Sequence, residues 1–151
     1  MRASIYLFTA SIVCGAQALA QDHEMSGDPA AGEGAFNQCA TCHVVTNDEG
    51  ETLAGRNGRQ GPNLYGVIGR QAGSVEGFRY GNSMVEAGEQ GLVWDEENFV
   101  AYVQDPSGFL KEYLDDPRAR GNMTYRVRDE EDAVNLAAFL ADIGPEEDGV
   151  N

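Results

Sequence analysis

A five-residue motif constrains this chain more than any other feature of its sequence. Residues 39–43 read Cys-Ala-Thr-Cys-His, so two thiols stand three positions apart and an imidazole follows directly. Thiols at this spacing can form thioethers with the two vinyl groups of a haem, and the adjacent imidazole then lies under the iron. The motif therefore predicts covalent haem attachment through Cys39 and Cys42, with His43 as an axial iron ligand.

The first twenty residues have the pattern of an export signal. They hold one cation (Arg2), no acid, an apolar run over residues 5–13, and the small-x-small site Ala18-Leu19-Ala20. We expect cleavage after Ala20 and a periplasmic protein, in agreement with the motif, because c-type haem is attached outside the cytoplasm. Retention of the signal as an anchor is the alternative. Stable membrane insertion is not expected, since spanning a bilayer takes roughly 20 apolar residues.

The cysteine count excludes other uses of the thiols. Cys39 and Cys42 are the only cysteines beyond the signal, because Cys14 lies inside it. Two cysteines cannot build a disulfide framework. A structural zinc site needs four Cys or His ligands, and only His43 and His23 could add to these thiols. A thioredoxin-like motif goes with a βαβ pattern, whereas Gly-rich sequence follows residue 43. Haem attachment is the interpretation that remains.

The charge and the length of the chain limit the classes of protein to which it can belong. The 151 residues carry 25 Asp+Glu against 10 Lys+Arg, a net charge of −15, which effectively excludes binding to a nucleic acid backbone. With 42% apolar residues, the chain predicts one compact, monomeric domain. We place this domain at residues 29–144, after a flexible N-terminus at 21–28 and before an acidic flexible tail at 145–151.

Capping signals predict helices and no strand pattern competes, so the expected fold class is all-α. Asp-Pro pairs at residues 28–29 and 105–106 combine an N-cap with proline at the first helical position. The expected helices run from Ala30 to Ala40, from Asp95 through Val103, from Asp105 to about Leu114, and from Asp129 to a stop at Gly144-Pro145. The glycine-rich stretch between residues 43 and 80 predicts irregular backbone wrapped closely around a flat cofactor.

The second axial position decides the function. His23, Met25, Met84 and Met123 are the candidate ligands. The first two precede the first helix and would have to fold back, and Met84 begins a short helix-like stretch that favours core packing. Met123 lies between a turn and the last helix, where a loop can carry a side chain onto the open haem face. We expect Met123 to be the ligand.

Five features occur together in this chain: the motif at 39–43, the segment Gly61-Pro62-Asn63-Leu64-Tyr65-Gly66, the pair Gly69-Arg70, Trp94 and Met123. In this combination the sequence resembles class I cytochrome c, and specifically the cytochrome c2 group. The resemblance covers nearly all of the chain beyond the signal. It implies a small helical shell around one covalently attached haem c, in which the first and last helices cross. Gly32 and Phe36 match the crossing positions of the first helix, and Leu136 and Phe139 are plausible counterparts on the last.

The resemblance also implies roles for single residues. The carbonyl of Pro62 would accept a hydrogen bond from the other imidazole N–H of His43. Tyr102 is similar to the tyrosine beside the methionine sulfur, and Tyr125 to the aromatic residue two positions after the ligand. The implied partners of the haem propionates are Arg70, Tyr80 and Trp94.

With both axial positions filled, the resemblance implies a one-electron carrier and not an enzyme. Its implied donor is a quinol-oxidising cytochrome bc complex, and its acceptor is a photosynthetic reaction centre or a terminal oxidase. The rival hypothesis is a haem enzyme or a gas-binding haem protein with a labile sixth ligand. Lys111 is the only lysine, so the family's lysine ring is missing. We expect arginines between residues 105 and 128 to form a locally basic docking edge instead, unless they pair with neighbouring acids.

Overall fold

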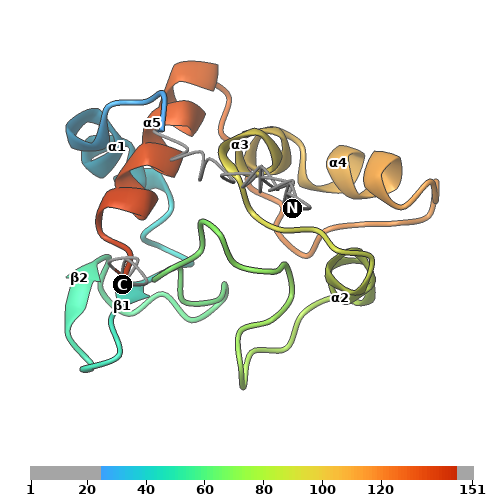
Figure 1. Cartoon of the computed structure of the whole chain (residues 1–151), viewed down its shortest axis with the longest axis horizontal. Coiled ribbons are helices and arrows are strands. Elements are labelled where there is room, and N and C mark those ends of the chain that lie inside the picture. Colours follow the sequence, from blue (N-terminus) through green and yellow to red (C-terminus); the bar gives the residue numbers. More distant parts are fainter. Residues whose placement is uncertain (1–24, 146–151) are drawn as a thin grey trace, which may run out of the picture.

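The computed structural model describes residues 25–145. In chain order the elements are α1 (Pro29–Ala35), the 3-10 helix η1 (Phe36–Gln38), the strands β1 (Val45–Thr46) and β2 (Thr52–Ala54), then α2 (Asn82–Glu89), α3 (Glu96–Gln104), α4 (Pro106–Tyr113) and α5 (Glu130–Asp142). Helices make up most of the regular structure, and the fold is all-α as predicted (Figure 1). The predicted signal peptide, His23 and most of the acidic tail lie outside the described residues. Among the described residues, no helix is both long and apolar enough to cross a membrane.

The first and last helices, α1 and α5, cross as the resemblance implied (Figure 1). A Cβ on Gly32 would collide with the carbonyl of Asn135 and the Cβ of Phe139, so only glycine lets the two backbones come this close. Next to this contact, the rings of Phe36 and Phe139 pack with their centroids 5.7 Å apart. Leu136 is buried at the same interface.

Aspartate side chains begin four of the helices at the predicted places. Each accepts a hydrogen bond from a backbone N–H of the first turn: Asp28 from Ala30, Asp95 from Asn98, Asp105 from Gly108, and Asp129 from Glu131. The structure thus confirms the capping signals in the sequence, including Pro29 and Pro106 at the first helical positions.

Two local features differ from expectation. The α-helical part of the first helix ends at Ala35 and continues as η1 only to Gln38, not to Ala40. Residues 45–46 and 52–54 form a small antiparallel hairpin, too short to show an alternating pattern in the sequence. Near the N-terminal end of the described residues, Met25 packs against the core, and the backbone N–H of Ser26 donates to the Glu96 carboxylate at 2.7 Å.

The glycine-rich stretch is irregular, as predicted, and follows the lower part of the molecule in Figure 1. Gly66 and Gly69 have φ angles of 63° and 82°, which residues other than glycine rarely adopt. The stretch is tied to the segment before α3 through an isolated bridge between Gln71 and Val93. In Figure 1 it lies below the crossing helices, and we call residues 43–80 the glycine-rich wall.

Candidate haem site

A single cavity gathers every site residue predicted from the sequence. Its volume is about 440 Å³, and it lies between η1, the glycine-rich wall, α3, α5 and the loop before α5. The predicted residues that line it are Cys39, Cys42, His43, Pro62, Arg70, Tyr80, Trp94, Tyr102 and Met123. Most of the remaining lining is apolar, with Leu64, Val67, Phe99 and Leu136 among its members.

The two thiols lie in a turn that continues directly from η1. The backbone N–H groups of Cys42 and His43 both donate to the carbonyl of Cys39 at 3.0 Å, which places both cysteines and the histidine on one tight turn. Both cysteines are free and half-buried. Burial, together with the nearby Cys42, raises the pKa of the Cys39 thiol to about 11. Cys39 is therefore a neutral thiol at physiological pH.

His43 is held as a neutral imidazole with one nitrogen free. Its Nδ1 lies 3.0 Å from the carbonyl oxygen of Pro62, which can only accept, so Nδ1 carries the proton. Burial lowers the pKa of His43, against the opposing effect of the Pro62 hydrogen bond. Nε2 is left with its lone pair, as an imidazole ligand of a metal requires.

Two glycines make room for this imidazole. A Cβ on Gly61 would lie 2.5 Å from Nδ1 of His43, and a Cβ on Gly58 would lie 2.5 Å from the His43 backbone nitrogen. The backbone N–H of Gly61 also donates to the Cys42 carbonyl at 2.8 Å. The Gly-Pro pair at 61–62 therefore approaches the ring closely and presents the Pro62 carbonyl to it.

Arg70 belongs to the glycine-rich wall and lines the cavity. Its guanidinium donates to the carbonyls of Tyr65 at 2.8 Å and Asn63 at 3.1 Å. Burial lowers the pKa of Arg70, and Tyr80 opposes this effect, while burial raises the pKa of Tyr80. Within the part of the chain that the structure describes, no carboxylate lies within ion-pairing distance of Arg70. The guanidinium and the Tyr80 hydroxyl therefore offer donors to an anionic group in the cavity.

Two methionines line the cavity. Met84, on α2, is only 7% exposed and belongs to the core, whereas Met123 is half-buried in the loop before α5. Met25 does not line the cavity. Trp94 and Tyr102 also lie in this part of the site, with ring centroids 5.0 Å apart, and burial raises the pKa of Tyr102 to about 12.

Asn63 has a structural role that the sequence analysis did not assign. Its Oδ1 accepts from the backbone N–H of Thr46 at 3.0 Å, and its Nδ2 donates to the Thr46 carbonyl at 2.6 Å. These bonds tie the segment that holds Pro62 to the hairpin. The available signal was the place of Asn63 directly after Gly61-Pro62 in the segment that carries the resemblance.

Comparisons with known proteins identify the family. No family model matches the chain. Cytochrome c2 of Rhodovulum adriaticum is 62% identical over 125 residues, which cover 83% of this chain and 99% of the relative. Cytochrome c2 of Cereibacter sphaeroides is 57% identical over 127 residues, covering 83% of this chain and 85% of the relative.

A solved structure of cytochrome c2 from Rhodobacter sphaeroides superposes with a TM-score of 0.77 at 57% identity, and the match covers 78% of this chain and 97% of that one. The chain belongs to the cytochrome c2 family. Cytochromes c2 are electron carriers and not enzymes, and membership implies a covalently bound haem c.

The cavity fits the haem that a cytochrome c2 implies. Two free thiols, a neutral imidazole with an open nitrogen and a thioether line it, and these are the groups that attach a haem covalently and ligate its iron. The remaining lining is mostly apolar, and Arg70 and Tyr80 supply polar contacts. The donor set and the shape of the wall agree with the family.

Proposed function

We propose that the chain is a periplasmic one-electron carrier with one covalent haem, His43 and Met123 being the axial ligands. It would take electrons from a quinol-oxidising cytochrome bc complex and deliver them to a photosynthetic reaction centre or a terminal oxidase. The observation that carries the proposal is the gathering of a neutral imidazole, two thiols and a loop-borne thioether around one largely apolar cavity. The export signal supports the periplasmic location.

The residues of the cavity suit this task. When bound, the haem supplies one-electron cycling between Fe(III) and Fe(II). The Pro62 carbonyl fixes the His43 ring and keeps its free nitrogen available. Met123 offers a soft, neutral sulfur that favours the ferrous state, and the apolar lining disfavours the extra positive charge of the ferric state, so we expect a positive reduction potential.

The assignment of Met123 is tested by comparing two methionine variants. Met123→Ala should abolish the weak ferric absorption band at the red edge of the spectrum that reports methionine ligation, and it should let cyanide bind readily. Met84→Ala should keep the band, because Met84 is a core residue on α2. Loss of the band in the Met84 variant alone would show that the assignment is wrong. A wild-type protein without the band would favour the rival, a haem enzyme or gas-binding protein with a labile sixth ligand.

A further inference from the structure

The loop that carries Met123 has almost no main-chain support. Within the described residues, no backbone–backbone hydrogen bond involves residues 122–126. Its two ends are fixed: the N–H of Gly121 donates to Ser107 Oγ at 3.1 Å, and the N–H of Val127 donates to the Val103 carbonyl at 2.9 Å. The residues between these anchors depend on side-chain contacts.

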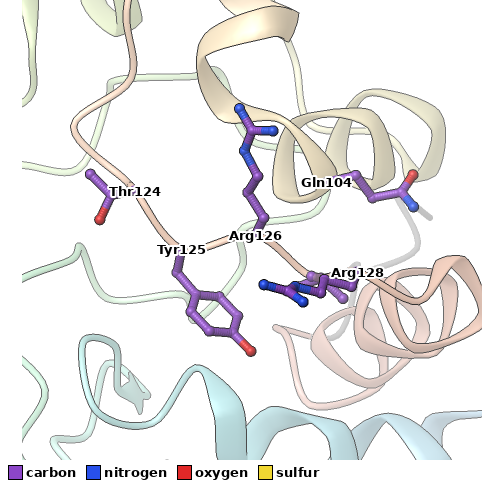
Figure 2. A pocket seen from close by; sticks show the side chains of 6 residues that line it. Gln104, Thr124, Tyr125, Arg126 and Arg128 are labelled. Carbon is purple, nitrogen blue, oxygen red and sulfur yellow. The ribbon is translucent and has the colours of Figure 1, made fainter.

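Two side chains of the loop reach outward in opposite directions (Figure 2). Arg126 pairs with Asp105 at 2.7 Å, and so returns to the α3–α4 junction near which the loop is already anchored. Tyr125 points the other way, and its hydroxyl donates to Oε1 of Gln38 in η1 at 2.8 Å. Tyr125 and Gln38 both line the cavity. The Tyr125 contact is therefore the one that links the loop to the segment bearing the thiols.

Gln38 is oriented for this contact by a third residue. Its Nε2 donates to the carboxylate of Asp132 in α5 at 3.3 Å. A carboxylate accepts hydrogen bonds and does not donate them, so the amide nitrogen of Gln38 must face Asp132 and the amide oxygen must face Tyr125. One chain of hydrogen bonds thus joins the loop, η1 and the first turn of α5.

We propose that the chain Tyr125–Gln38–Asp132 is a latch that holds the Met123 loop closed over the cavity. Tyr125 and Gln38 are positioning residues in this proposal, since they act through Met123. The inference rests on the proposed function in taking Met123 as the iron ligand. A ligand loop without main-chain hydrogen bonds opens more readily when a side-chain anchor is lost, and an external ligand then reaches the iron more often.

The latch is tested by imidazole binding to the oxidised holoprotein, with the methionine band as the second readout. Tyr125→Phe removes the hydroxyl and keeps the ring. Because one hydrogen bond is lost, we expect the apparent affinity for imidazole to rise about three- to tenfold. The methionine band should persist without imidazole, since Met123 itself is unchanged. Gln38→Met should produce the same rise.

The matched control is Tyr113→Phe, which deletes a tyrosine hydroxyl on α4, away from the cavity lining, and should leave imidazole binding at the wild-type value. The double variant of Tyr125 and Gln38 should bind imidazole no more tightly than the stronger single variant, because both substitutions remove the same hydrogen bond between Tyr125 and Gln38. Wild-type affinity in Tyr125→Phe, or a double variant whose rise is the product of the two single rises, would overturn the latch alone. A wild-type protein without the methionine band would overturn the proposed function, and the latch with it.

Discussion

His43 shows how a few backbone groups prepare one side chain for a single chemical role. The Pro62 carbonyl sets its tautomer, and Gly61 leaves the space that the ring occupies. The resemblance predicted the Pro62 contact because it depends on a short, distinctive segment. The part played by Asn63 was not predicted, since it depends on a hairpin too short to show a strand pattern in the sequence.

Tyr102 supplies a test at the residue scale through its buried hydroxyl. Burial raises its pKa in the folded protein from 10.0 to about 12, so above pH 10 the unfolded chain ionises while the native residue stays neutral. The native state then binds more protons than the unfolded state, and its stability falls as the pH rises from 10 towards 12.

We expect the free energy of unfolding to drop by up to about 2 to 3 kcal/mol across this range. The drop should be smaller in Tyr102→Phe, where Tyr80 is the one tyrosine of the described residues that still contributes a raised pKa. Guanidinium unfolding curves recorded at intervals between pH 10 and about 12 measure this drop in the free energy of unfolding. An equally steep loss in the variant would show that Tyr102 is not the group responsible.

At the scale of elements, the helix starts were predictable, whereas the end of the first helix was not. An aspartate cap and a following proline act locally, so their effect can be read from adjacent residues. The change from α1 to η1 has no such local signal. It occurs where Phe36 packs on Phe139, about a hundred residues away in the sequence, and where the turn bearing the thiols begins.

The crossing of α1 and α5 is tested by two glycines of one helix. Gly32→Ala would place a methyl group against the Asn135 carbonyl, and we expect it to lower the free energy of unfolding by about 3 kcal/mol. Gly34→Ala is the matched control, because a Cβ there meets nothing within 4 Å.

Gly34→Ala should raise stability by about 0.5 to 1 kcal/mol, since alanine favours a helix over glycine. Thermal unfolding of the holoproteins measures both changes. Equal effects of the two substitutions would contradict the close approach of the helices.

For the whole molecule, the net charge can be counted from the sequence, whereas the pairing of individual charges could not be predicted from it. The formal net charge is −15, yet the described residues form only two ion pairs, Arg126 with Asp105 and Arg118 with Asp116. Both involve arginines of the stretch expected to form a basic edge. Arg120 and Arg128 are exposed and make no ion pair within the described residues, so within this stretch they are the arginines best able to meet an acidic partner.

Charge reversal at these two positions tests the docking proposal. Arg120→Glu and Arg128→Glu should together lower the second-order rate of electron transfer to a purified reaction centre or oxidase by about tenfold at low salt, and should flatten its dependence on ionic strength. Arg118→Glu is the control, since its charge already faces Asp116 at 3.4 Å. Stopped-flow or flash kinetics give the rates. If Arg118→Glu lowered the rate as much as Arg120→Glu or Arg128→Glu does alone, net charge and not position would be what matters.

The pairing of α1 with α5 also bears on the order of events during folding. The main partner of α1 is α5, where Gly32 lies against Asn135 and Phe139, so α1 lacks this partner until residues 130–142 have folded. The turn with Cys39 and Cys42 follows directly from α1 through η1. Because the partner of α1 lies about a hundred residues further along the chain, α1 and the turn that bears both thiols become fixed only late in folding.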